Sequence, residues 1–472
     1  MRTSLSLERL GHTTGGREIW ARRSPGSIRS RPQSWLNGQL GCDMVDVVFT
    51  SSHRATLGGS MNGILDAVVI GAGSAGLGVS YFLKQRALDH EVLERKRIGE
   101  TWRTQRWDSF RLNSPRIRSL LPGDSYDGPD PWGASTQHDF VIYLESYADR
   151  HGLPVRARTP VHEVTGDDRL FEVATPQGRF SARNLVVASG SLNCPMRPHW
   201  WGQLPRSLYQ LDASNYRNAA DLEDGSVLVV GSGQSGGQIA EDLVLAGRSV
   251  FLATSRAGRL VRRYRGGDIF NWMTLSGYLD VPREELVLPS GKLPPRALLG
   301  ATHTISLQSL SAQGIVLLGR FIGAEKNALL FDNDLVDHIR FADESSAEVK
   351  RFIDRYIERA GLNAPSAEDD PAEMIERCLP DPPIRSIALS TSNIRSVIWC
   401  TGFKGNFQWI QIPGVLDASG QPIHKDGIAA VPGVYFAGLD FATTRKSGTI
   451  PGVAEEALRL VNHLTQRADH PA

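Results

Sequence analysis

Two glycine motifs of the form G-x-G-x-x-G constrain this chain more than any other feature. The first contains Gly71, Gly73 and Gly76, and the second contains Gly231, Gly233 and Gly236. Each follows a short apolar run and precedes a segment with helical spacing of apolar residues. In such a strand-turn-helix unit, glycine lets the backbone approach a pyrophosphate, and the helix N-terminus offers its N–H groups to the anion. The pair predicts two dinucleotide sites, although ordinary tight turns also require glycine.

The residues after the second strand of each unit indicate which nucleotide binds there. Glu94 ends the expected strand 90–94, about 20 residues beyond the first glycine, where a carboxylate accepts hydrogen bonds from an adenosine ribose. An acid at this position is typical of FAD or NAD. The second unit has Thr254, Ser255 and Arg256 instead. A guanidinium with two hydroxyls suits the extra phosphate of NADP, while a solvated loop arginine is the alternative for Arg256.

Length and composition favour a large enzyme. The chain has 472 residues, 41% of them hydrophobic, and a net charge of +1, so it can bury two cores. Its 52 basic and 51 acidic residues indicate neither nucleic acid nor an anionic membrane as a partner. No apolar run reaches the roughly 18 residues of a membrane span. The four cysteines form no C-x-x-C pair, so we expect no metal site and a cytoplasmic location.

The first sixty residues differ from the rest because they are rich in arginine, serine and glycine and lack sustained periodicity. Three interpretations of residues 1–60 remain open. The true start is Met44 or Met61, or the segment is a flexible tail, or it is an organelle-targeting peptide. A secretory signal is disfavoured because no apolar core follows the basic residues.

Several stretches resemble the flavin-containing monooxygenase family, and in particular its bacterial flavoproteins. They are G-E-T-W-R at 99–103, W-D-S-F-R-L-N-S-P at 107–115 and V-L-V-V-G-S-G-Q-S-G at 227–236. The segments 186–190 and 398–403 look like the paired short strands at which the chain of such proteins crosses between domains. The stretch 432–438 resembles the strand that closes over the flavin. The resemblance covers nearly all of the chain from Met61 onward.

This resemblance implies an α/β fold with two Rossmann-like dinucleotide-binding domains. An FAD domain would be built from residues 61–214 and 390–472. An NADPH domain would be inserted at 215–389, and its region from about 264 to 390 would line the substrate pocket. The last helix, expected at 452–466, would direct its N-terminus at the flavin ring. We expect a helix at 347–361 on the basis of its apolar stripe.

The resemblance also implies roles for individual residues. Trp102 and Arg103 lie in the loop over the flavin. Gly438 and Asp440 follow the closing strand, where an acid can hydrogen-bond the ribitol or pyrophosphate of FAD; an ordinary surface aspartate is the alternative. Asn113 occupies the place of an asparagine beside the reactive flavin carbon, where an amide can donate to a peroxyflavin oxygen without expelling peroxide. Its alternative role is to cap the turn before Pro115.

Departures from the family pattern weaken the case for oxygenation more than the case for the cofactors. The family carries F-x-G-x-x-x-H-x-x-x-Y or W before its second motif. The stretch 206–216 retains only Tyr216, with Asp212 in the place of the histidine. Gly99-Glu100 replaces Gly-Gly ahead of Thr-Trp. Asp212 is therefore a candidate for altered chemistry beside NADPH.

The function expected from these features is an FAD- and NADPH-dependent monooxygenase. It would insert one atom of O2 into a small organic substrate through a peroxyflavin. Two alternatives remain: an NADPH oxidase or reductase without oxygen insertion, and a dinucleotide-binding regulatory protein without turnover. The sequence indicates neither the substrate nor the oligomeric state.

Overall fold

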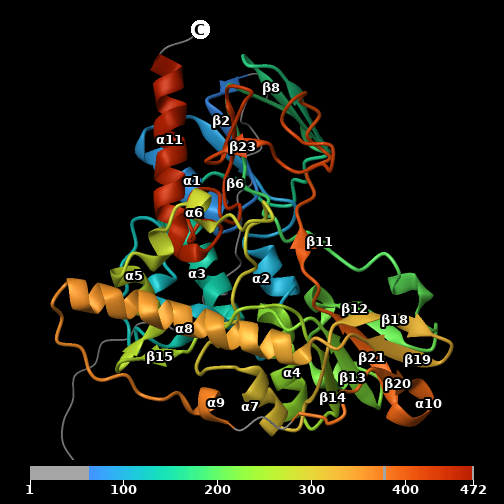
Figure 1. The fold of residues 1–472 in the computed structure, drawn as a ribbon. Coiled ribbons are helices and arrows are strands. Elements are labelled where there is room, and N and C mark those ends of the chain that lie inside the picture. Colours follow the sequence, from blue (N-terminus) through green and yellow to red (C-terminus); the bar gives the residue numbers. More distant parts are fainter. Residues whose placement is uncertain (1–62, 376–378, 470–472) are drawn as a thin grey trace, which may run out of the picture. The chain divides into compact units, whose positions relative to one another are not determined.

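The computed structural model describes residues 63–375 and 379–469 (Figure 1). The extension at 1–60 therefore lies outside the described residues. Two largely parallel sheets dominate the fold, and each contains the strand that leads into one of the glycine motifs.

The first sheet surrounds the strand before Gly71. Its spatial order is β23 (His424–Lys425), β24 (Ile428–Ala429), β25 (Val434–Phe436), β10 (Leu185–Val187), β2 (Ala67–Ile70), β3 (His90–Leu93) and β6 (Val155–Arg156). The strands from β25 to β6 are parallel, and β24 and β23 continue the edge in antiparallel fashion. Because β25 comes from the C-terminal part of the chain, this sheet is built from two segments of the sequence.

The second sheet surrounds the strand before Gly231. Its order is β12 (Tyr209–Asp212), β21 (Ile394–Trp399), β13 (Ser226–Val230), β14 (Val250–Ala253) and β17 (Val316–Leu318), and every neighbouring pair is parallel. Strands β2 and β13 each lie between the strand after their own helix and a strand from later in the chain. In α/β sheets, nucleotides bind at such a reversal of strand order.

The strand pairing corrects the expected domain boundaries at 214/215 and 389/390. Strands β12 and β21 both belong to the second sheet, although the sequence predicts that their residues lie in the FAD domain. The chain crosses between domains at β11 (Cys194–Pro195) and β22 (Phe403–Lys404), which pair with each other in antiparallel fashion. The boundaries therefore lie near 195 and 403. Sequence spacing does not reveal this, because sheet membership depends on which strands pair.

Helices and smaller sheets cover these two layers. The helices are α1 (Ser74–Gln85), α2 (Glu100–Thr104), α3 (Gln137–Arg150), α4 (Gln234–Leu245), α5 (Ile269–Leu275), α6 (Arg283–Leu286), α7 (Leu307–Ala312), α8 (Leu335–Arg359), α9 (Pro371–Met374), α10 (Leu389–Ser392) and α11 (Val453–Asp469). The further strands are β1 (Ile64–Leu65), β4 (Arg111–Pro115), β5 (Ala134–Thr136), β7 (Glu163–Gly166), β8 (Phe171–Thr175), β9 (Gly178–Ala182), β15 (Arg263–Tyr264), β16 (Gly267–Asp268), β18 (Phe321–Glu325), β19 (Ala328–Phe331) and β20 (Ser386–Ala388).

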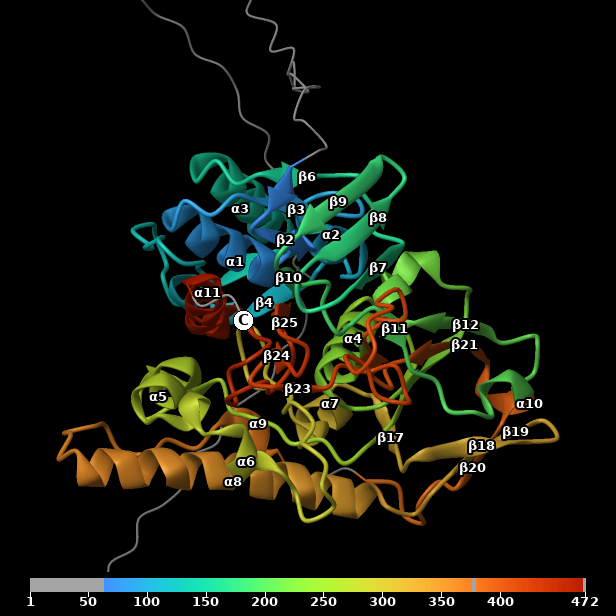
Figure 2. The ribbon, with the colours of Figure 1, turned by 90° about the horizontal axis from the view of Figure 1, so that it is seen from above.

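Helices α11 and α8 bury the apolar residues of their sequence patterns against neighbouring elements. Helix α11 lies along α1 (Figures 1 and 2), and a Cβ on Gly78 would come within 2.4 Å of Val453, so the two helices approach closely. Helix α8 contains the stripe expected at 347–361 but begins earlier, at Leu335. Its N-terminal half buries Ile339 and Ala342 among polar neighbours, which obscured the periodicity there.

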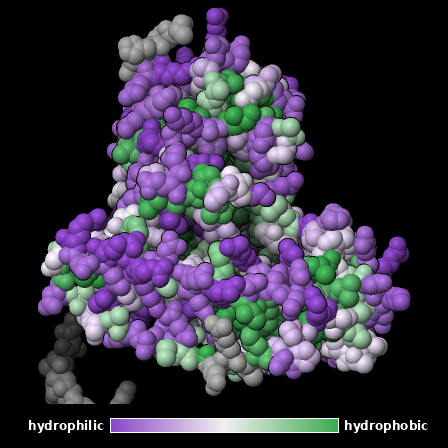
Figure 3. Space-filling view, viewed as in Figure 1, coloured by the Kyte–Doolittle hydropathy of each residue, from purple (hydrophilic) through white to green (hydrophobic). Residues whose placement is uncertain are grey.

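The largest hydrophobic cluster joins the two domains. It contains Val69 of β2 and Val229 of β13, both fully buried. The visible face in Figure 3 is largely hydrophilic, with scattered hydrophobic areas. Within residues 63–375 and 379–469, no helix has the length and apolar content needed to cross a bilayer.

Candidate active site

A close contact between glycines forms the first nucleotide cradle. Gly71 has φ +110°, and a Cβ there would lie 2.6 Å from the carbonyl oxygen of Ala188. A Cβ on Gly76 would lie 1.9 Å from the carbonyl oxygen of Gly71. Both positions therefore require glycine. Gly73 precedes α1, and a Cβ there would meet nothing within 4 Å, so the cradle has open space in front of the helix N-terminus.

Two serine hydroxyls at this cradle have no protein partner. The Oγ atoms of Ser74, the first residue of α1, and of Ser189, which follows β10, are buried without a hydrogen bond among the described residues. Buried hydroxyls are normally paired, so these two call for an acceptor from a ligand. Pyrophosphate oxygens at a helix N-terminus supply such acceptors.

Glu94 directly follows β3, at the position from which a carboxylate is expected to contact an adenosine ribose. Its Oε2 accepts the N–H of Ala72 at 2.9 Å, and its Oε1 accepts the N–H of Lys96 at 2.8 Å. These bonds fix the carboxylate at the end of β3 but leave lone pairs on both oxygens. The glycines, the two hydroxyls and Glu94 together fit FAD.

Gly438 and Asp440 complete the cradle from the C-terminal segment. Gly438 has φ +78°, and a Cβ there would lie 2.8 Å from the Cβ of Ala75 in α1. Asp440 accepts a hydrogen bond at 3.0 Å from Arg296, which belongs to the inserted domain. The Asp440 side chain is 45% exposed. The structure thus brings Asp440 to the domain junction, held by an arginine that the sequence analysis did not single out.

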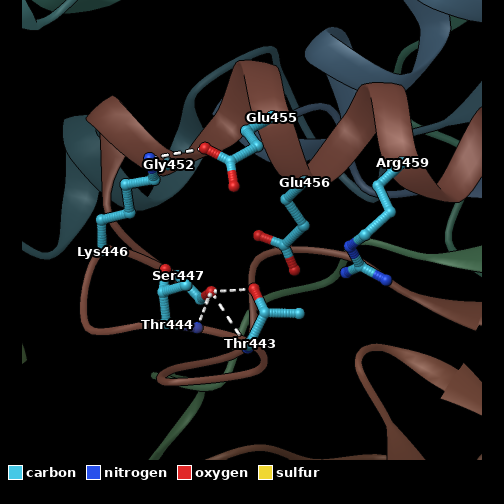
Figure 4. A pocket seen from close by; sticks show the side chains of 8 residues that line it. All are labelled: Thr443, Thr444, Lys446, Ser447, Gly452, Glu455, Glu456 and Arg459. Carbon is cyan, nitrogen blue, oxygen red and sulfur yellow. Dashed lines mark hydrogen bonds and ion pairs between the residues drawn. The ribbon is translucent and has the colours of Figure 1, made fainter. Parts of the chain in front are cut away.

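A buried acid lies directly behind Gly438. Glu456, in the first turn of α11, accepts the N–H of Gly438 at 3.2 Å. Figure 4 shows the Glu456 carboxyl and the Arg459 guanidinium pointing from α11 toward the loop with Thr443 and Ser447, where they line a small cavity. Burial raises the pKa of Glu456 to about 7. A change in its charge would therefore alter the electrostatic potential beside Gly438.

The second cradle repeats the geometry of the first. A Cβ on Gly231 would lie 2.6 Å from the carbonyl oxygen of Cys400, and one on Gly236 would lie 1.7 Å from the carbonyl oxygen of Gly231. Gly233 again precedes the helix, α4, and a Cβ there would meet nothing within 4 Å. Ser255 joins this turn to β14, because its N–H donates to Ser232 Oγ at 2.9 Å.

The three residues expected to select NADP have different environments. Arg256 is exposed, and its guanidinium stacks 4.5 Å above the ring of Phe341 in α8. Ser255 forms hydrogen bonds with Ser232 and is only partly buried.

Thr254 is 2% exposed, and its hydroxyl donates to the carbonyl of Leu318 at 2.7 Å. Thr254 therefore supports the loop from inside the fold, which corrects its expected place among phosphate contacts. Arg256 remains, and it fits the 2′-phosphate of NADPH.

Asn113 lies where the two domains touch. It belongs to β4 of the first domain, and its Oδ1 accepts a hydrogen bond at 2.9 Å from Gln238 of α4 in the second domain. Its backbone carbonyl accepts a hydrogen bond at 2.7 Å from Arg262. Arg262 is 4% exposed and forms a buried ion pair with Asp268. The hydrogen bond from Gln238 thus fixes the orientation of the Asn113 side-chain amide, and it uses the side-chain oxygen Oδ1.

Trp102 and Arg103 lie on α2 and are held by neighbours in the first domain. The ring of Trp102 packs against Phe140 at 5.0 Å between centroids, with the Arg106 guanidinium 4.9 Å from it. Arg103 forms an ion pair with Glu145. Both residues therefore anchor the short helix, and any cofactor contact they make comes in addition to these bonds.

Asp212 is paired with an arginine on both carboxylate oxygens. It ends β12, and Arg197 donates to its two oxygens at 2.7 and 2.9 Å. Such a bidentate pair fixes the orientation of the carboxylate. Asp212 thus fixes the crossing segment near β11 rather than offering a free acid.

A cavity of about 430 Å³ adjoins this junction through Arg262. It falls in the region expected to line the substrate pocket, and the polar side chains of Arg262, Thr304 and Asp370 line it together with apolar surface. Its size is within the range of small-molecule sites. Among residues 63–375 and 379–469, no group of three metal-ligating side chains comes together.

Comparisons with known proteins identify relatives of this chain. The model of the pyridine nucleotide-disulphide oxidoreductase family matches residues 68–265. An uncharacterized CzcO-like oxidoreductase of Geobacillus kaustophilus is 33% identical over 407 residues, which cover 86% of this chain and 99% of that protein. The chain belongs to the CzcO-like family of oxidoreductases.

More distant proteins connect this CzcO-like oxidoreductase with flavin monooxygenases. The indole-3-pyruvate monooxygenase YUCCA8 of Oryza sativa is 30% identical over 260 residues, covering 52% of this chain and 61% of the relative. The solved flavin-containing monooxygenase from Stenotrophomonas maltophilia superposes with a TM-score of 0.58 at 20% identity, covering 86% of this chain and 99% of that one. The expected family resemblance and the fold with two dinucleotide domains are confirmed.

Sequence reasoning missed several residues of this CzcO-like site. Ser74 and Ser189 flank the first cradle, but single serines beside glycines carry no pattern of their own. Arg296 and Glu456 reach the cradle from segments distant in the sequence. Gln238 lies within the second motif's helix, where a glutamine alone predicts nothing.

Substitution by alanine should have different effects on protein stability at Gly73 and at Gly76. We expect Gly73→Ala to give folded protein that loses FAD, because the added methyl group takes only the space in front of α1. Gly76→Ala should destabilise the fold by about 3 kcal/mol or more, since its Cβ meets a backbone carbonyl. Circular dichroism and flavin absorbance per mole of protein check this. Full flavin content in Gly73→Ala would contradict the cradle assignment.

Glu456 predicts a distinct pH dependence of stability. Its pKa is about 7 in the folded protein against an ordinary 4.5, so the native state binds more protons and the free energy of unfolding falls as pH rises through that window. Glu456→Gln removes this loss. Its unfolding midpoint relative to wild type should therefore rise between pH 5 and pH 7 and then level off. The exposed neighbour Glu455, changed to Gln, provides the control. A constant difference across this range would refute the buried-acid account.

Proposed function

We propose that this chain is a monooxygenase that binds FAD at the first cradle and NADPH at the second. The observation that carries the proposal is the position of Asn113, which belongs to the FAD domain and is bonded to the first helix of the NADPH domain. Bound FAD would supply hydride acceptance from NADPH and activation of O2, with one oxygen atom delivered to the substrate and the other released as water.

The residues of the first domain hold the flavin nucleotide. Gly71 and Gly76 bring the backbone within reach of the pyrophosphate, Ser74 and Ser189 donate to its oxygens, and Glu94 accepts from the ribose. Gly438 and Asp440 border the ribitol. Arg296 offsets the charge of Asp440 through an ion pair.

The residues of the second domain hold NADPH. Gly231, Gly233 and Gly236 form the pyrophosphate cradle, Ser255 borders the adenosine ribose, and Arg256 binds the 2′-phosphate. The ring of Phe341 supports the guanidinium from below, which keeps its N–H groups directed outward for bidentate contact.

Asn113 donates to the reacting oxygen. Its Oδ1 is occupied by Gln238, so its Nδ2 is the end left for a ligand. A primary amide stabilises developing negative charge on oxygen without releasing an acidic proton. The substrate, a small organic molecule, enters through the cavity beside Arg262.

One observation favours a second function, that of an NADPH oxidase or reductase. Asp212 stands where the resemblance places a histidine, and it is locked in an ion pair with Arg197. If that histidine is needed to protect the oxygenated state, its replacement would let electrons pass to O2 without insertion. Peroxide released in equal amount to the NADPH consumed, with every substrate tried, would favour this function.

Arg256 should set the preference for NADPH over NADH. We expect Arg256→Ala to raise the KM for NADPH by roughly tenfold to a hundredfold and to leave the KM for NADH within about twofold, since one charge-assisted phosphate contact is lost. Steady-state kinetics with both cofactors measures this. Arg340→Ala removes an exposed arginine next to Phe341 and provides the control. An equal rise in both KM values would refute the phosphate contact.

Asn113 should limit the escape of peroxide. We expect Asn113→Ala to retain FAD and to release hydrogen peroxide about tenfold faster than wild type when NADPH is supplied without substrate, because one donor to the reacting oxygen is lost. An oxygen electrode with catalase addition measures the release. Asn462→Ala, on the exposed surface of α11, is the control. Unchanged release in Asn113→Ala would count against this role.

A further inference from the structure

The side chain of Gln238 connects the two nucleotide domains. It projects from α4, one turn beyond Gln234 at the start of the helix, and its Nε2 donates to Asn113 Oδ1 at 2.9 Å. The bond decides which end of the Asn113 amide remains free: the carbonyl is taken, and the donor is left. Gln238 thus acts on the candidate site through Asn113.

The other end of the same amide has no partner. Gln238 Oε1 is buried and forms no hydrogen bond among the described residues. A buried carbonyl without a donor costs about 1 to 3 kcal/mol, so a purely structural glutamine would be a poor choice here. The atom requires an N–H or O–H group that none of the described residues supplies.

Gln234, four residues earlier on the same helix, shows how α4 uses a glutamine for structure alone. Its Nε2 donates to the carbonyl of Leu299 at 2.9 Å, and its Oε1 accepts the N–H of Leu299 at 3.0 Å. Both ends of that amide are satisfied by one backbone residue. Gln238 differs because only its donor end is used within the protein.

The position of Gln238 indicates where the missing donor comes from. The N-terminus of α4 receives the pyrophosphate of the nucleotide in the second cradle, and Gln238 lies about 6 Å further along the helix. From there its side chain reaches Asn113 of the flavin domain. A nucleotide that extends from the second cradle toward the flavin passes this point with its nicotinamide half, whose carboxamide carries two N–H groups.

We propose that Gln238 is a positioning residue with two tasks: its Nε2 fixes the Asn113 amide, and its Oε1 accepts a hydrogen bond from the carboxamide N–H of NADP(H). This inference rests on the proposed binding of NADPH at the second cradle. It assigns the nicotinamide end of that site, for which the glycine motif gives no residue.

A cofactor analogue tests the hydrogen bond directly. The 3-acetylpyridine analogue of NADP⁺ keeps the carbonyl but replaces the amide NH2 by a methyl group. In the oxidised holoenzyme, titration followed by flavin absorbance gives the Kd of each ligand without turnover. We expect wild type to bind NADP⁺ about fivefold tighter than the analogue, which corresponds to one neutral hydrogen bond. In Gln238→Met, which matches the shape but offers no amide, the two Kd values should agree within twofold.

Two further measurements separate positioning from stability. Gln308→Met removes another buried glutamine, on α7, whose amide donates to Asp343, and it should lower the unfolding midpoint while keeping the fivefold preference. Peroxide release should rise in Gln238→Met as in Asn113→Ala, and the double variant should show less than the product of the two increases, because both changes remove the same arrangement.

The outcomes are distinct. A fivefold preference that persists in Gln238→Met would overturn the carboxamide contact, as would equal binding of both ligands to wild type. Multiplicative effects in the double variant would overturn the positioning of Asn113. If Gln238→Met does not fold, Gln238→Glu, which keeps an acceptor but repels Asn113 Oδ1, should retain the preference and still raise peroxide release; loss of the preference would overturn the inference. Failure of wild type to bind NADP⁺ at all would instead refute the proposed function.

Discussion

The whole arrangement depends on one contact that occurs twice. In each cradle, the third glycine of the motif packs its Cα against the carbonyl oxygen of the first, so closely that a Cβ would lie within 2 Å of that oxygen. This contact brings the N-terminus of α1 to the end of β2, and that of α4 to the end of β13. The direction of the helix N–H groups, and therefore the place of each phosphate, follows from it.

The junction between the domains turns two separate nucleotide sites into one candidate active site. Asn113 is held from the other domain by Gln238 through its side chain and by Arg262 through its backbone. Arg262 is itself fixed by its buried ion pair with Asp268, and burying two charges costs free energy unless they are well paired. These directional bonds hold β4 against α4 at the junction.

Much of the first site could be predicted from sequence because its signals are local. The glycines, the strand before them and Glu94 lie within about thirty residues, and each is required by backbone geometry or by a ribose hydroxyl. The domain boundaries could not be predicted in the same way, since β12 and β21 join the second sheet through pairing with distant strands. Thr254 shows a similar limit: its type suits a phosphate, but the register of β14 against β17 turns it inward.

The junction was the least predictable part because its residues have ordinary sequence surroundings. Asn113 was found only through the family resemblance, and Gln238, Arg262 and Arg296 acquire meaning only from partners more than a hundred residues away. Asp212 illustrates the reverse case. Its position in the motif suggested chemistry, whereas its bidentate pair with Arg197 gives it a role in holding the crossing segment.

We propose that the two cradles hold their cofactors face to face, so that a hydride passes directly between them. Anaerobic stopped-flow reduction of the purified flavoprotein by NADPH carrying deuterium at C4, in each of its two stereochemical forms, tests this most directly. We predict that the bound flavin is bleached and that only one of the two forms slows the bleaching. A preparation that binds no flavin, or a flavin that NADPH does not reduce, would contradict the account.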